Sequence, residues 1–119
     1  MINLDTHILI HALNGSLRKQ EHLLLTQHDW CISGIVLWEL AKLHQLGRLS
    51  TSLDHPGFRN AMNFIQVIPI DDAIAKQSCE LDFSGDPADE LIAATSICHD
   101  IPLLTRDKRI TSSRLVPLA

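Results

Sequence analysis

Residues 86–107 read DPADELIAATSICHDIPLLTRD, and this stretch decides the fold class. Asp86 suits the N-cap of a helix and Pro87 its first position, so a helix is predicted from here to about His99. The apolar stretch IPLLTRD, residues 101–107, then predicts a strand closed by polar residues. A helix followed at once by a buried strand is typical of α/β proteins.

The rest of the chain repeats this alternation. The apolar stretches INLD (2–5), WCIS (30–33) and QVIPI (66–70) predict three more strands, and RLVPL (114–118) predicts an edge strand because it contains Pro117. Helical spacing of apolar residues predicts helices in residues 9–25, with a break near Asn14 and Gly15, and in residues 35–46, 53–64 and 71–81. Such alternation predicts an α/β fold whose parallel sheet is covered on both faces.

Length and composition indicate one globular domain spanning residues 1–119. No apolar run approaches the ~18 residues that cross a bilayer, and residues 1–10 contain Asp5 instead of a basic region, so neither export nor a membrane anchor is expected. Three cysteines without a CxxC pair indicate reduced, buried thiols and a cytoplasmic location. The net charge of −4 argues against a basic nucleic-acid surface, so a polyanion must be met locally or through metal.

Two acids follow predicted strands. Asp5 stands at the carboxyl end of the first strand, and Asp107 comes just after the carboxyl end of the strand in 101–107. Open α/β sheets bind their ligands at this edge, so both carboxylates are predicted to face the same rim. A plain capping role for each is the alternative, because Asp at such a junction commonly caps the next helix.

Glu39 and Asp89 are two further candidates. Glu39 projects from a mainly apolar side of its predicted helix, where an unpaired carboxylate is costly and needs a cation, a proton or water. Its alternative is a surface ion pair with Lys42, three residues further on. Asp89 lies one turn before the apolar face of the helix in 86–99, so it is predicted to project towards the strand ends, although it also suits a capping box with Asp86.

The predicted fold allows Asp5, Glu39, Asp89 and Asp107 to converge from four separate segments. Two carboxylates about 5 Å apart repel by about 3 kcal/mol at an effective dielectric near 20, so four together need a counter-charge. A divalent ion supplies it, and all-oxygen ligands favour Mg²⁺ or Mn²⁺ over zinc. Such a site can activate water and stabilise charge on a phosphodiester oxygen.

At this point the sequence resembles the PIN-domain ribonucleases, and among them the VapC-like toxins of toxin–antitoxin pairs. The resemblance spans nearly the whole chain and is carried by the ordered strings LDTHILIHAL (4–13), ISGIVLWELAKLHQLGRL (32–49), DPADELIAATS (86–96) and IPLLTRDKRI (101–110). It implies a three-layer α/β/α PIN-like domain with a central, mainly parallel sheet of four to five strands. It also implies Mg²⁺- or Mn²⁺-dependent endoribonuclease activity, a homodimer, and a small cognate antitoxin that occupies the site.

The resemblance also assigns site residues. The acidic quartet of the family falls on Asp5, Glu39, Asp89 and Asp107. Our hypothesis is that the three aspartates hold the metal and that Glu39 also belongs to its site, where it orients or deprotonates the attacking water. Residues expected to support the quartet are Thr6, Asp86 and Thr105. By our hypothesis, the basic residues that meet RNA phosphates are Arg48, Arg106, Lys108 and Arg109, and the alternative for each is a solvated surface charge. The chain departs from many relatives at Ala88 and Glu90, where they carry an aromatic residue and an arginine, and Glu90 would repel phosphate unless it points away.

Other classes fit less well. A receiver-like module needs an acid at the end of its third strand, which QVIPI lacks. Aspartyl phosphatases need a second acid two residues after Asp5, and this chain lacks it. A zinc protease needs a glutamate directly after His7, which is also missing, and His7 is expected at the rim near Asp5 instead. A PIN-like binding or RNA-processing protein without a toxin role remains the alternative, and the RNA substrate cannot be read from the sequence.

Overall fold

The computed structural model describes residues 1–119 and contains one four-stranded sheet, in which all neighbouring strands are parallel. The strands are β1 (Ile2–Leu4), β2 (Trp30–Ser33), β3 (Ile65–Ile68) and β4 (Leu103–Leu104), in the spatial order β3-β2-β1-β4. Central β1 pairs Asn3 with Cys31 on one side and with Leu103 on the other. All four carboxyl ends therefore point to one edge of the sheet.

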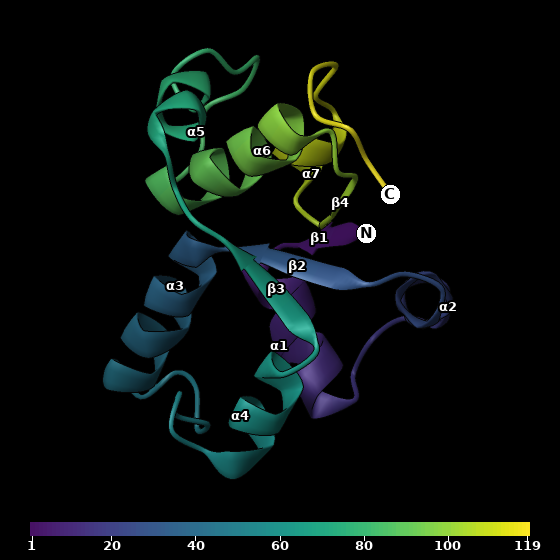
Figure 1. The fold of residues 1–119 in the computed structure, drawn as a ribbon, viewed down its shortest axis with the longest axis vertical. Coiled ribbons are helices and arrows are strands. Elements are labelled where there is room, and N and C mark those ends of the chain that lie inside the picture. The colour runs from purple at the N-terminus through teal and green to yellow at the C-terminus, as the bar shows by residue number, and fades with distance from the viewer.

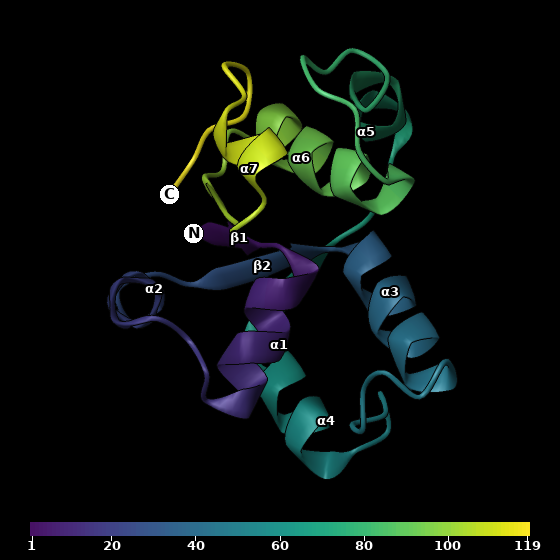
Figure 2. The ribbon, with the colours of Figure 1, turned by 180° about the vertical axis from the view of Figure 1, so that it is seen from behind.

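Helices cover both faces, as Figures 1 and 2 show. On one side lie α1 (Thr6–Asn14), α3 (Gly34–Gln45) and α4 (Pro56–Met62), and on the other lie α5 (Asp72–Gln77), α6 (Pro87–His99) and α7 (Lys108–Thr111). The helix α2 (Lys19–Thr26) lies to the side, near the start of β2. The predicted three-layer α/β/α fold with a parallel sheet is confirmed.

The main core surrounds β1 and β2. Fully apolar strands are expected where both faces of a sheet are covered, and the two central strands are almost entirely inaccessible to solvent. Small residues in α6, Ala93 and Ala94, let that helix approach the sheet closely. Buried Asn3 donates from Nδ2 to Ser96 Oγ at 2.9 Å and to the Ile92 carbonyl at 3.3 Å, which ties β1 to α6. This tie fixes the body of α6 relative to the middle of β1.

Several predicted boundaries were wrong. The predicted edge strand 114–118 is reduced to a single bridge between Leu103 and Leu118. Its backbone N–H groups are diverted, because that of Arg114 donates to the Asp82 carboxylate and those of Leu115 and Val116 donate to the Ser113 hydroxyl. The sheet thus has four strands, and the tail joins β4 through two backbone hydrogen bonds, from Leu103 N–H to the Pro117 carbonyl at 2.9 Å and from Ala119 N–H to the Leu103 carbonyl at 3.0 Å.

Helix lengths also differ from the prediction. The helix expected over 53–64 begins only at Pro56, where the ring of His55 accepts the Gly57 N–H and caps it. The helix expected over 71–81 ends at Gln77. The short helix α7 was not predicted.

The cysteines are all free, as expected, but only Cys31 is buried, whereas Cys79 and Cys98 are exposed. The prediction of buried thiols was therefore wrong for two of them. No helix has the length and apolar character required to span a bilayer.

Candidate active site

Asp5 links the first strand to the first helix. Its backbone is extended, with φ −64° and ψ 153°, and its Oδ1 accepts the Thr6 N–H at 2.7 Å, so it does cap α1. Its second oxygen, Oδ2, accepts the Thr105 hydroxyl at 2.6 Å. The side chain is thereby fixed between the ends of β1 and β4 while only 7% of the residue is exposed. Capping and a place in the shared rim are compatible for this residue.

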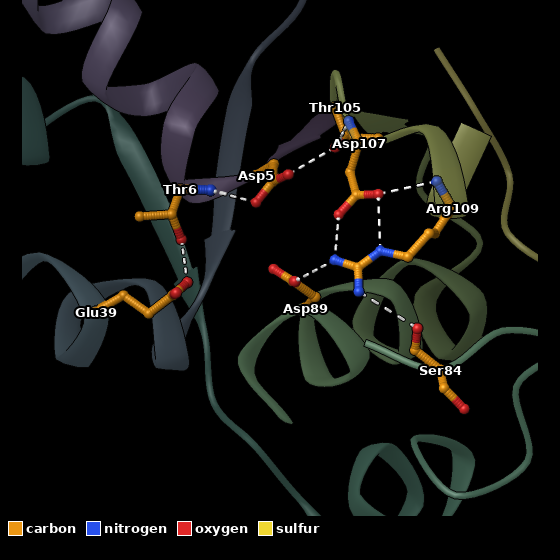
Figure 3. A network of polar contacts seen from close by, with 8 residues as sticks. All are labelled: Asp5, Thr6, Glu39, Ser84, Asp89, Thr105, Asp107 and Arg109. Carbon is orange, nitrogen blue, oxygen red and sulfur yellow. Dashed lines mark hydrogen bonds and ion pairs between the residues drawn. The ribbon is translucent and has the colours of Figure 1, made fainter. Parts of the chain in front are cut away.

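Glu39 reaches the same place from α3. Thr6 donates its hydroxyl to Glu39 Oε1, which connects this carboxylate to the residue after Asp5 (Figure 3). Lys42 does not pair with Glu39 but donates to Gln45 Oε1 at 3.2 Å, so the surface ion-pair alternative was wrong. Burial raises the pKa of Glu39, and the nearby charge of Asp5 adds to this increase.

Asp89 projects from the first turn of α6, with 18% of its side chain exposed. Burial, together with the negative charges of Asp5, Glu39 and Asp107, raises its pKa from 3.8 to about 6. Asp86 is the N-cap residue of α6, yet its side chain makes no capping hydrogen bond. The acids of this turn are therefore not consumed in capping the helix.

Asp107 begins α7, where its Oδ1 accepts the Arg109 N–H at 2.9 Å. The guanidinium of Arg109 returns to the same carboxylate, with Nη2 2.9 Å from Asp107 Oδ2 and 3.4 Å from Asp89 Oδ2. The hydrogen bonds from Arg109 lower the pKa of Asp107. Asp89 and Asp107 thus have opposite pKa shifts within one cluster.

These side chains line one open cavity of about 460 Å³ at the carboxyl edge of the sheet. None of its nine lining residues is hydrophobic: Asp5, Thr6, His7, Glu39, Asp86, Asp89, Arg106, Asp107 and Arg109. The four predicted acids therefore come together from four segments. Of the predicted cations, Arg106 and Arg109 line the cavity, whereas Lys108 and Arg48 do not. Glu90 also lies outside the lining, so it does not oppose an anion there.

The donor set suits a hard divalent ion, because carboxylate and hydroxyl oxygens line the cavity and cysteine is absent from it. Burial first and the neighbouring acids second raise the pKa of Asp89, so a bound cation would favour its ionised form. As the side chains lie, however, no three acids, histidines or cysteines are arranged to hold one ion together. The ligand chemistry of the site fits Mg²⁺ or Mn²⁺. The carboxylates are too widely spaced to bind one ion together, so side chains must move when the ion binds.

Sequence reasoning missed the partner of Arg106. Its guanidinium forms a two-pronged ion pair with Glu21 of α2, with Nη2 2.7 Å from Oε1 and Nε 2.8 Å from Oε2. A third donor, Nη1, contacts His11 Nε2 at 3.0 Å. The Arg106 side chain is therefore largely committed to structure, which leaves it less free to meet a phosphate than predicted. No local pattern links residues 21 and 106.

This ion pair predicts acid-sensitive stability. Hydrogen bonding to Arg106 lowers the pKa of Glu21 from 4.5 to about 2. The ion pair between Glu21 and Arg106 therefore stabilises the fold fully above pH ~4.5, and this stabilisation is lost as the pH falls towards 2. We expect Glu21→Gln to reduce the free energy of unfolding by about 1–3 kcal/mol at pH 7, a value discounted for the partial exposure of Arg106.

Urea unfolding at pH 7, 4 and 3 measures this effect. The difference between Glu21→Gln and the parent should stay nearly constant down to about pH 4.5 and shrink below it, so it should be clearly smaller at pH 3 than at pH 7. Glu80→Gln removes an exposed acid and should change the free energy little at any pH. An equal cost for Glu21→Gln at pH 7 and pH 3 would contradict the assignment.

Fold and site together define an α/β domain with an acidic cavity at the carboxyl edge of a parallel sheet. The family model of the PIN domain matches residues 2–113, and the chain belongs to this family. Within it, the resemblance to VapC-like proteins is confirmed by Ribonuclease VapC22 of Mycobacterium tuberculosis (strain ATCC 25618 / H37Rv), which is 31% identical over 89 residues, covering 72% of this chain and 68% of that protein.

Solved structures agree on the fold. A toxin–antitoxin complex from Klebsiella pneumoniae contains a chain with a TM-score of 0.70 and 24% identity, covering 94% of this chain and 91% of that one. VapBC2 from Rickettsia felis, bound to a DNA fragment from its promoter, contains a chain with a TM-score of 0.75 and 21% identity, covering 100% of this chain and 98% of that one.

Proposed function

We propose that this chain, as a single PIN domain, is a Mg²⁺- or Mn²⁺-dependent endoribonuclease and the toxin of a toxin–antitoxin pair, present in the cytoplasm. The observation that carries the proposal is the convergence of Asp5, Glu39, Asp89 and Asp107 in one cavity without hydrophobic lining. The relative named Ribonuclease VapC22 supports nuclease activity, and the solved toxin–antitoxin complexes support an antitoxin partner. The homodimer stays a prediction from the family resemblance.

In this mechanism Asp5, Asp89 and Asp107 would hold the metal. A bound divalent ion would activate water and stabilise charge on the phosphodiester oxygen. Glu39 belongs to the same site and accepts the proton of the attacking water, a role for which its raised pKa is suited. Thr105 keeps Asp5 in place by donating to its Oδ2, and Thr6 holds Glu39. Asp86 adds negative charge at the rim.

Cleavage of a structured RNA, measured by gel in Mg²⁺, in Mn²⁺ and in excess EDTA, tests the nuclease proposal. We expect internal cuts with either ion and at least about a hundredfold loss with EDTA, because the four carboxylates cannot replace the charge that the ion contributes. Cleavage that persists undiminished in EDTA would exclude the metal-dependent mechanism. No cleavage under any condition would favour the alternative, a PIN-like binding protein.

The toxin role is a separate question from catalysis. Induced expression should arrest growth if the chain is a toxin, and co-expression of the short protein encoded next to it should restore growth. Inhibition of the RNA cleavage assay by that purified partner would connect the two results. Active nuclease without growth arrest or inhibition would favour an RNA-processing role instead.

A further inference from the structure

Arg109 lies among the acids of the cavity instead of at its outer rim. Figure 3 shows its guanidinium between Asp107 and Asp89, with dashed contacts to both carboxylates and to the loop before α6. Nη2 lies 2.9 Å from Asp107 Oδ2, Nε lies 3.3 Å from Asp107 Oδ1, and Nη1 lies 3.5 Å from the Ser84 carbonyl oxygen. Two of its nitrogens thus contact the cavity acids and the third contacts the loop before α6, although 52% of the side chain is exposed.

The guanidinium of Arg109 lies between Asp89 and Asp107, where a metal ion shared by these two predicted ligands would lie. Asp89 and Asp107 come from different segments, and the guanidinium is the positive group that contacts both. Its planar fork binds carboxylates at fixed geometry and draws Asp107 towards itself. This offers a physical reason why no three acids are arranged to hold an ion as the side chains lie.

We propose that Arg109 is the resident counter-charge of the acidic cavity and competes with the divalent ion for Asp89 and Asp107. The proposal rests on the metal site of the proposed function. Asp89 and Asp107 bind either the guanidinium or the ion, so loading requires Arg109 to leave. The same guanidinium cannot neutralise Asp107 and meet an RNA phosphate at one time, so Arg109 becomes available to substrate only after it is displaced.

A simpler role must be distinguished from this one. Arg109 could merely connect α7 to the loop before α6, in which case its loss would lower stability equally with and without metal. Competition makes a different prediction, because removing a competitor strengthens metal binding while removing a counter-charge weakens the metal-free protein. Metal affinity and thermal stability therefore decide between the two roles without any activity measurement.

The test compares Arg109→Ala with Lys108→Ala by titration with Mn²⁺ in a calorimeter and by thermal unfolding in EDTA and in saturating Mn²⁺. Lys108 is exposed, adjacent in α7 and outside the cavity lining, so it controls for the loss of one positive charge. We expect Arg109→Ala to bind Mn²⁺ about tenfold more tightly than the parent, and Lys108→Ala to change the affinity by less than about twofold. In EDTA, Arg109→Ala should unfold at a lower temperature than the parent.

Each outcome is decisive. Unchanged or weaker Mn²⁺ binding by Arg109→Ala, with binding by the parent intact, would overturn competition and leave the proposed function standing. No Mn²⁺ binding by either protein would overturn both proposals. Metal binding that tightens as expected in a protein that does not cleave RNA would support competition and remove the nuclease. If Arg109→Ala does not fold, Arg109→Lys, which keeps the charge but loses the fork, should tighten binding about threefold, and no change there would also overturn competition.

Discussion

Asp5→Asn is expected to abolish metal-dependent RNA cleavage, by roughly a hundredfold or more, while the protein remains folded. Asp5 contributes the carboxylate that is most firmly positioned, since Thr6 N–H and the Thr105 hydroxyl hold one oxygen each. Asparagine keeps the shape and can still accept the Thr6 N–H through Oδ1. Its amide can donate to Thr105 Oγ1, whose hydroxyl is free to rotate. The fold therefore survives, but the charge that an ion requires is gone.

Gel assays with purified proteins, together with circular dichroism and thermal unfolding, check this expectation. Asp54→Asn removes an exposed carboxylate outside the cavity lining and should cleave RNA like the parent. Equal activity of Asp5→Asn and the parent would defeat the assignment of the catalytic site. A fold lost in Asp5→Asn would instead reveal that the capping role dominates.

The fold was predictable where apolar patterns are continuous. Residues 2–4 and 30–33 read as buried strands because helices cover both faces of the sheet, and they form its centre. The end of the chain was less predictable. The stretch 114–118 has strand-like composition, but its backbone donors bind neighbouring Ser113 and distant Asp82, and no local pattern records the contact with Asp82.

The candidate site shows the same division. Asp5 and Asp107 could be placed because parallel strands end at one edge of a sheet, and Glu39 because a lone acid on an apolar helix side demands a partner. The positions of the basic side chains could not be predicted, because several acids lie within reach of Arg106 and Arg109 and only the folded geometry decides which of them each arginine pairs with. One binds Glu21, 85 positions away in the sequence, and the other turns into the cavity.

Asp89→Asn is expected to stabilise the metal-free protein at pH 8, because Arg109 contacts Asp89 at 3.4 Å but compensates the charge of the cavity acids only in part. The pKa of Asp89 is raised from 3.8 to about 6 in the folded state. The folded protein therefore binds a proton at Asp89 more tightly than the unfolded chain, and the parent loses stability as the pH rises from about 3.8 through about 6. A shift of about two pKa units corresponds to at most about 3 kcal/mol, and solvent in the open cavity screens the carboxylate and lowers this value. Asparagine cannot ionise, so it avoids the cost.

Urea unfolding in EDTA at pH 4 and pH 8 measures this gain, which should be near zero at pH 4 and largest at pH 8. Thermal unfolding with Mn²⁺ should then show the reverse, because Asp89→Asn lacks one metal ligand and should gain far less from the ion than the parent. Glu90→Gln removes the same charge one residue along α6, outside the cavity lining, and should do neither. If Asp89→Asn were less stable than the parent in EDTA at pH 8, the carboxylate would be satisfied by its present neighbours, and the need for a cation would lose its physical basis.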